Sequence, residues 1–315
     1  MVLHLLRRTT VFVVSLVVAS VAVFAFMTVL PGDPARVALG VNATEEAVAA
    51  TRAEFGTDRP LVVQYADWVS GLPRGEFGRS YVTDADIGPQ IVDRLLVTTW
   101  LVLSGMVVAL IVALPLGIAA AVRHRTPSGA LISGLSQVGV AVPSFIAGIL
   151  LVTVFAVRLG WLPSGGWTPP AQDPVQFLRQ LALPALALGL VQGAVLTRYV
   201  RSAVLDVLRE DFLRTARAKG LTPTRALVRH GLRNAAIPVV TVLGLQLATL
   251  LIGAVVVERV FVIPGLGSLL LDGVANRDLL LVQGVVIVLV LAVLVVNFLV
   301  DVAYTVLDPR LRRAG

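Results

Sequence analysis

The chain has 315 residues, of which 57% are hydrophobic and only 14% are charged, with a mean hydropathy of +0.89. Because soluble domains are typically about 45–50% apolar, this composition excludes an ordinary soluble domain. The net charge of +7 comes from basic residues that long uncharged blocks interrupt, a pattern typical of membrane orientation and not of nucleic-acid binding.

Uncharged blocks long enough to cross a membrane recur along the chain. A transmembrane helix needs about 20 mostly apolar residues, and the blocks that meet or nearly meet this length are Thr9–Leu30, Leu95–Val122, Thr126–Val157, Gln180–Thr197, Asn234–Val257 and Leu279–Val300. The sequence therefore predicts an all-α integral membrane protein with six transmembrane helices. A further apolar stretch, Val260–Leu271, is short and broken by proline and glycine, which favours a re-entrant or interfacial loop.

The first block raises the question of a cleaved signal peptide, because Arg7 and Arg8 precede it. A signal core usually has about 7–15 apolar residues, whereas this block has 22 and then ends abruptly at Pro31-Gly32-Asp33-Pro34. We expect a retained first helix, with cleavage as the alternative.

Basic residues are distributed unevenly between the loops. If the N-terminus is cytoplasmic, 16 of the 26 basic residues fall inside, whereas residues 31–94 carry ten acidic residues against six arginines. Since positively charged loops stay inside, both termini are predicted to be cytoplasmic. The predicted parts are a cytoplasmic N-terminus with the first helix (1–30), an extracytoplasmic segment (31–94), a transmembrane core (95–305) that includes a cytoplasmic loop (198–238), and a cytoplasmic tail (306–315).

The extracytoplasmic segment carries signals of local order. The stretch Thr44–Phe55 has a helical pattern, and glycines mark a turn region at Gly75–Ser80. We expect a small external cap, with a solvated loop as the alternative.

The loop 198–238 is the longest charged interval in the second half of the chain. It holds nine basic residues, and its apolar residues Leu205, Leu208, Phe212 and Ala216 follow one another at helical intervals. Gly220 predicts a helix stop, Thr222 an N-cap and Pro223 a first helical position. The pattern therefore predicts a helix, a tight turn and a second helix that together dock on another protein; the alternative is that the cations only set the topology.

Several kinds of chemistry are excluded. The chain has no cysteine, its three histidines (His4, His124 and His230) lack metal-ligand spacing, and its one lysine, Lys219, does not follow the glycine pattern of a nucleotide-binding loop. No catalytic constellation is present, so we expect a transport subunit and not an enzyme, without metal or nucleic acid. The predicted spans contain no charged residue, so energy must come from another polypeptide or a gradient. Their strongest polar residues either line a translocation path or hydrogen-bond neighbouring helices, and these residues are Gln137, Gln192, Gln246 and Asn297.

Ordered sequence blocks over nearly the whole chain resemble one family, the permease subunits of bacterial ATP-binding-cassette (ABC) importers of the dipeptide, oligopeptide and nickel type. The blocks that carry the resemblance are 30–34 (LPGDP), 55–61 (FGTDRPL), 75–80 (GEFGRS), 142–145 (VPSF), 198–201 (RYVR), 214–221 (RTARAKGL), 229–234 (RHGLRN), 258–261 (ERVF), 264–267 (PGLG) and 307–310 (LDPR). In the family's coupling motif, a glutamate and an alanine are replaced here by Arg214 and Thr215, as in other peptide-type permeases.

The resemblance implies a type I importer permease fold in the cell membrane. It implies four kinds of partner besides lipid: a second related permease, two ATPase subunits that bind ATP and magnesium, an external substrate-binding protein, and a peptide or related solute as cargo. This chain itself would bind no cofactor. The rival expectation is a gradient-driven secondary transporter or channel.

The resemblance also assigns roles to residues. The residues expected to couple to the ATPase are Phe212, Arg214, Thr215, Ala216, Arg217, Ala218, Lys219 and Gly220. The residues expected to contact the binding protein are Glu258, Arg259, Pro264, Gly265 and Gly267.

Overall fold

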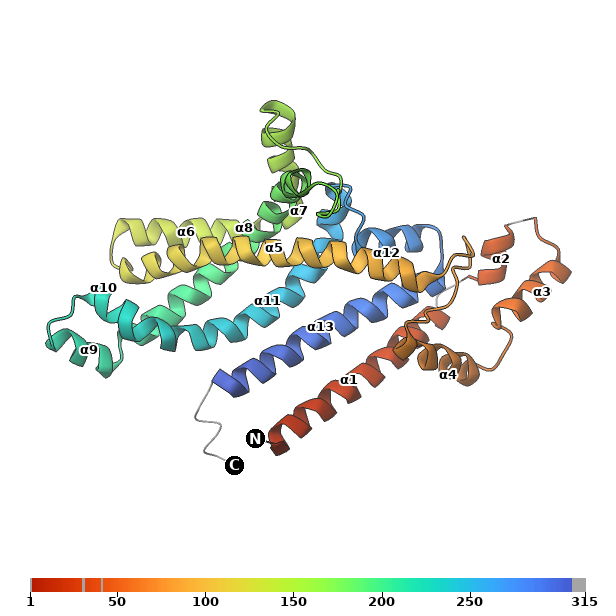
Figure 1. Ribbon diagram of the computed structural model, residues 1–315, viewed down its shortest axis with the longest axis horizontal. Helices are drawn as coiled ribbons and strands as arrows, with labels where there is room; N and C mark the ends of the chain where they lie inside the picture. Colours follow the sequence, from red (N-terminus) through yellow and green to blue (C-terminus); the bar gives the residue numbers. More distant parts are fainter. Residues whose placement is uncertain (1, 30–31, 41, 308–315) are drawn as a thin grey trace. The chain divides into compact units, whose positions relative to one another are not determined.

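The computed structural model describes residues 2–29, 32–40 and 42–307, and in this part of the chain the regular elements are helices, with one isolated bridge between Arg79 and Asp86 (Figure 1). The chain divides into two compact units, one of residues 1–6, 99–263 and 296–315, the other of residues 7–98 and 264–295.

The unit around residues 99–263 contains most of the helical core. Its helices are the later part of α5 (Ile87–Val122), α6 (Pro127–Ala141), α7 (Ser144–Leu151) with a π-helical continuation (Val152–Arg158), α8 (Pro174–Leu208), α9 (Asp211–Ala218), α10 (Pro223–Ala226) with a π-helical continuation (Leu227–Gly231), and α11 (Leu232–Val260).

Close packing of α5 against α8 organises this unit. A Cβ at Gly189 would lie 2.5 Å from Cβ of Val108, and one at Gly117 would lie 2.6 Å from Cβ of Val200 and 3.0 Å from the carbonyl oxygen of Thr197. Small residues let membrane helices approach this closely, since packing contacts replace the hydrophobic effect inside a bilayer. The two contacts also set the register, in which Gly117 lies level with Thr197 and Val200.

The third predicted span, Thr126–Val157, consists of two helices and not of one. The chain breaks between α6 and α7 and bends by 99°. Val142 is extended, with ψ of 119°, and Pro143 follows it, because proline disfavours helical backbone in the preceding residue. Among the described residues, five helices are long and apolar enough to span, or six if the bent pair counts as one.

The fourth predicted span lies within a much longer helix. Its 18 residues, Gln180–Thr197, lie within α8, which has 35 residues and continues to Leu208. The charged residues after Thr197 ended the sequence-based estimate, but they do not end the helix. Pro184 lies inside α8 and Pro115 inside α5, so neither proline interrupts its helix as Pro143 does.

The second unit contains most of the predicted external segment. Its helices are α1 (Val2–Val29) from residue 7, α2 (Pro34–Leu39), α3 (Glu45–Phe55), α4 (Leu61–Gly71) with a 3-10 turn (Leu72–Arg74), the start of α5, α12 (Leu266–Ala275) and the start of α13 (Leu279–Leu307). The predicted helix at Thr44–Phe55 is confirmed as α3, with Thr44 as its N-cap. A buried cluster joins α4, the start of α5, α12 and the start of α13, and its members include Trp68, Ile87, Ile91, Leu266, Leu281 and Val285.

Asp33 ties α2 to α3. Its side chain accepts a hydrogen bond from the amide of Ala35 at 3.1 Å, and Arg52 donates to its Oδ2 from Nε at 2.9 Å and from Nη2 at 2.6 Å. Burial acts to raise the pKa of Asp33, but the hydrogen bonds from Arg52 and from the Ala35 amide outweigh it, so this pKa lies below its ordinary value. The carboxylate therefore caps one helix and anchors the next.

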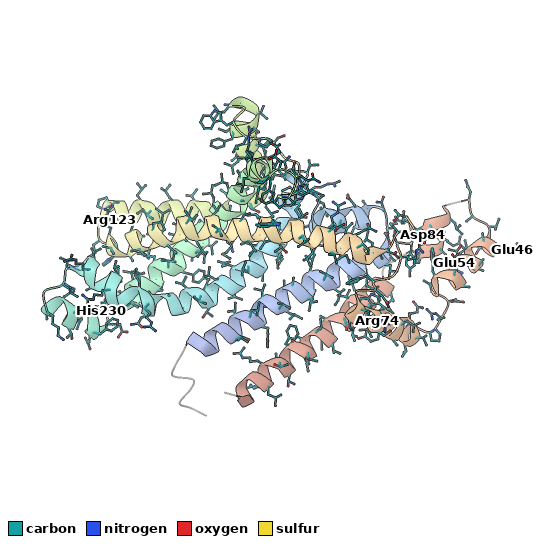
Figure 2. The ribbon with its side chains drawn as sticks, viewed as in Figure 1. Glu46, Glu54, Arg74, Asp84, Arg123 and His230 are labelled. Carbon is teal, nitrogen blue, oxygen red and sulfur yellow. The ribbon has the colours of Figure 1, made fainter. Side chains whose placement is uncertain are left out.

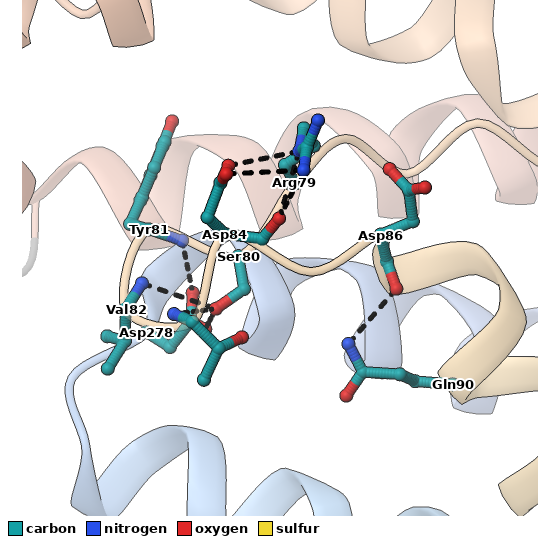
Figure 3. A network of polar contacts seen from close by, with 9 residues as sticks. Arg79, Ser80, Tyr81, Val82, Asp84, Asp86, Gln90 and Asp278 are labelled. Carbon is teal, nitrogen blue, oxygen red and sulfur yellow. Dashed lines mark hydrogen bonds and ion pairs between the residues drawn. The ribbon is translucent and has the colours of Figure 1, made fainter.

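Asp278 plays a similar part where the loop 79–86 meets the start of α13 (Figure 3). The Ser80 hydroxyl donates to Asp278, the amide of Tyr81 donates to it at 3.4 Å, and the amide of Leu281 donates at 3.3 Å. Burial, with this carboxylate nearby, raises the pKa of the Tyr81 phenol. Asp278 is itself buried, so hydrogen bonds to a buried carboxylate hold the loop in place.

Replacing Asp33 by alanine should loosen α2 in a pH-dependent way. Loss of an N-cap costs about 1 kcal/mol, so amide hydrogen exchange in α2 should become roughly fivefold faster at neutral pH. Because the folded-state pKa of Asp33 is depressed, its stabilisation is complete above about pH 4 and is lost as the pH falls through the folded-state pKa. The wild type should therefore approach the variant at low pH.

The matched control is Glu45→Gln, which removes a carboxylate that pairs with Arg36 on the surface. It should leave exchange in α2 nearly unchanged, because surface ion pairs contribute little. Equal exchange in Asp33→Ala and wild type at pH 7 would contradict the capping role.

Candidate functional site

Helix α9 lies near the end of α8 and the start of α11 (Figure 1), and one apolar side chain holds it there. Leu213 is 2% exposed, whereas most other residues of α9 are exposed. A Cβ at Gly231 would lie 3.4 Å from Cδ1 of Leu213, 3.2 Å from Cγ1 of Val207 and 2.7 Å from Cδ1 of Leu227. Leu213 therefore lies beside Gly231, and the space left by the missing Gly231 side chain is occupied most closely by Leu227.

The turn after α9 confirms the predicted stop and restart. Gly220 has φ of +92°, a left-handed conformation that side chains resist, and its amide donates to the Arg217 carbonyl at 2.9 Å. Thr222 caps α10 by accepting from the amide of Arg225, and Pro223 occupies the first helical position.

The predicted apolar stripe through Phe212 is wrong. The helix that carries Leu205 and Leu208 ends at Leu208, and α9 begins at Asp211, so the helical register restarts between them. Phe212 is consequently 38% exposed and Leu213 is buried. Sequence reasoning passed over Leu213, although it is the only large aliphatic residue between Asp211 and Ala218.

The outward surface of α9, which we call the α9 surface, is basic with one aromatic residue. The predicted coupling residues are exposed except for Ala216, which is half-buried. Arg214 meets Asp211 at 3.3 Å, whereas within the described chain no carboxylate lies within 4 Å of the nitrogens of Arg217 or Lys219. Figure 2 places Arg123 and His230 at the same end of this unit, so charge from two predicted cytoplasmic loops collects there.

Two of the predicted pathway residues bind each other. The side-chain amide of Gln192 on α8 donates to the side-chain oxygen of Gln246 on α11, and to the Gln246 carbonyl at 3.3 Å. Both residues are buried. This pair therefore fits the interpretation in which the glutamines join neighbouring helices. Gln137 on α6 and Asn297 on α13 are exposed and are not part of the pair.

The predicted binding-protein contacts differ in exposure. Glu258, Gly265 and Gly267 are buried, Pro264 is half-buried, and Arg259 is exposed. The Phe261 carbonyl accepts from the Gly166 amide at 2.9 Å, and Thr98 accepts from the Leu266 amide at 2.8 Å. Hydrogen bonds within each unit thus hold the backbone here. The contact with a binding protein stays a prediction, and Arg259 is the residue of this set that is exposed.

Comparison with known proteins gives a consistent assignment. The family described as "Binding-protein-dependent transport system inner membrane component" matches residues 113–313, and its N-terminal counterpart matches residues 1–104. Glutathione transport system permease proteins of Salmonella typhimurium strain LT2 and Escherichia coli strain K12 are 41% and 40% identical over 310 residues, 98% of this chain and of each relative. An inward-facing MetNI methionine ABC transporter structure aligns with a TM-score of 0.57 at 19% identity, covering 69% of this chain and 96% of that one, and shows a shared fold.

The glutamine pair should behave as one unit in a double-mutant cycle. Gln192→Leu or Gln246→Leu leaves a buried amide without its partner, whereas the double variant removes both. We expect a coupling free energy of about 0.6–1.7 kcal/mol in the unfolding of the purified protein, the range seen for hydrogen bonds between membrane helices. Asn297→Leu with Gln192→Leu serves as the uncoupled control, and additive effects of Gln192→Leu and Gln246→Leu would contradict the pairing.

Proposed function

The chain belongs to the family of inner membrane components of binding-protein-dependent transport systems, and from that premise we propose that it forms half of the pathway of an ATP-driven peptide importer. It is a multi-pass inner membrane protein with the type I importer permease fold, and it is a transport subunit whose ATPase partners are separate chains. The observation that carries the proposal is the α9 surface, which a single buried leucine presents to a partner.

The proposed assembly contains five chains. A second, related permease completes the pathway, two ATPase subunits bind on the side of α9, and a substrate-binding protein delivers cargo to the side of residues 31–94. In this arrangement α9 is cytoplasmic and the external cap is extracytoplasmic, as the distribution of basic residues predicts. Glu258, Arg259, Pro264, Gly265 and Gly267 remain our proposed region of contact with the binding protein.

The proposed mechanism is alternating access driven through α9. The ATPase subunits close on ATP and move α9, and the anchor Leu213 transmits this motion to the ends of α8 and α11 through Val207, Gly231 and Leu227. Shifting a two-state equilibrium from 1:99 to 99:1 requires about 5.5 kcal/mol of differential binding. Closure of an ATPase dimer on nucleotide can supply this energy, so cargo affinity for the permease need not.

The proposed cargo is a short peptide. Two similar proteins, about 40% identical over nearly the whole chain, are named as permeases for glutathione, a tripeptide. That similarity supports a peptide-sized solute, and the α9 surface supports ATP as the source of energy in preference to a gradient.

Gly220→Val should uncouple the chain from its ATPases. A branched side chain at φ of +92° costs about 1–2 kcal/mol, so the docking-competent turn should become roughly tenfold rarer. In proteoliposomes containing the complete importer, ATP-dependent peptide uptake and the amount of ATPase that co-purifies should both fall. Ala216→Asp should do the same by placing a carboxylate in the contact.

The matched control is Gly160→Val, because Gly160 also has positive φ and open space around its Cβ but lies far from α9 in the sequence. It should keep uptake and ATPase binding. Normal uptake in both Gly220→Val and Ala216→Asp would refute the docking role, and uptake abolished by an uncoupler but insensitive to ATP depletion would support the gradient-driven rival.

A further inference from the structure

A polar cleft of about 570 Å³ opens between α6 and α8, away from the glutamine pair. Four of its lining residues belong to α6 and the rest to the later part of α8. The residues that matter here are Ser133 and Gln137 on α6, and Arg198, Tyr199, Arg201 and Ser202 on α8. Ser133 and Gln137 are one helical turn apart, as are Arg198 and Ser202, so each helix turns one face to the cleft.

The charges in this cleft are unbalanced. Its lining includes two arginines and no aspartate or glutamate. Within the described residues, neither Arg198 nor Arg201 has a carboxylate within 4 Å, and Nε of Arg201 is buried without a hydrogen-bond partner. Two neighbouring guanidinium groups present planar arrays of donors that match an oxyanion. Gln137, Tyr199 and Ser202 add further donors at the same walls.

The helix register places these arginines beside the last turns of α5. Thr197 and Val200 on α8 lie level with Gly117 on α5, and α5 continues for five residues, about 8 Å, to Val122. Gln137 lies ten residues, or about 15 Å, after the start of α6. Arg198 and Arg201 come directly after the predicted span Gln180–Thr197, and α8 continues past them beside uncharged stretches of α5 and α6.

We propose that this cleft binds the carboxylate of the transported peptide on its way through the permease. The inference rests on the proposed function, and it adds a requirement for cargo with a free carboxylate. A buried charged group requires a partner, and the bound carboxylate supplies that partner to Arg201, whose Nε is buried. A lipid phosphate has the same oxyanion chemistry, and measurements on the purified complex distinguish the two ligands.

Binding can be tested without transport. The complete permease–ATPase complex is purified without nucleotide, and saturation-transfer NMR measures binding of trialanine and of trialanine amide. The variants are the double substitutions Arg198→Gln with Arg201→Gln and Arg198→Lys with Arg201→Lys, with Arg179→Gln as control, since Arg179 is an exposed arginine on the same helix.

Trialanine should bind the wild type and the Arg179→Gln control equally, and the lysine variant more weakly. Its saturation-transfer signal should fall at least fivefold in the glutamine variant. Trialanine amide should show the weak signal in every protein. Equal trialanine binding in the wild type and the glutamine variant would overturn the proposal. So would loss of a co-purifying phospholipid from the glutamine variant, measured by phosphorus NMR, because the cleft would then hold a lipid.

Uptake separates this inference from the function on which it rests. If the wild-type importer shows no ATP-dependent uptake of trialanine, the proposed function fails, whereas the binding comparison still reports on the cleft. If uptake is normal in the wild type and in the glutamine variant alike, the function stands and the carboxylate site is refuted.

Discussion

The burial of Leu213 beside Gly231 is the contact on which the proposed function depends. Helix α9 has eight residues, too few to be stable alone in water, and its polar residues contribute little to packing. The burial of one leucine therefore gives the segment a fixed place, while its basic and aromatic side chains remain available to a partner. Because Leu213, Val207 and Leu227 all lie around Gly231, a force on α9 acts where the ends of two long helices meet.

Polar side chains inside the helical core have two different surroundings. Gln192 and Gln246 satisfy each other between α8 and α11, so they contribute to packing. Arg198 and Arg201 belong to the same helix as Gln192, yet they face a cleft in which no acidic residue balances them. Burial penalises both arrangements unless partners are present. The two glutamines are hydrogen-bonded to each other, whereas the two arginines need a partner from outside the chain.

Local backbone conformation could be predicted from the sequence where a single residue determines it. Gly220, Thr222 and Pro223 each act as expected, and Thr44 begins α3. Features that depend on neighbouring helices could not be predicted. Charge ended the predicted fourth span at Thr197, but packing against Ala121 of α5 and Ala235 and Val239 of α11 carries α8 on to Leu208. The Leu213 anchor was missed because the restart of the helix after Leu208 shifts the buried face by one residue. The sequence could not distinguish Pro143, where the chain bends, from Pro115 and Pro184, which lie in unbroken helices.

Lys219 allows the most direct test of the central claim, because it is the only lysine in the chain. An amine-reactive reagent that cannot cross membranes is added to the inside or the outside of oriented vesicles, and modified peptides are identified by mass spectrometry. We expect Lys219 to be modified only from the cytoplasmic side and to be protected when the ATPase subunits are bound. Modification from the outer side, or equal modification with and without the ATPases, would contradict the account.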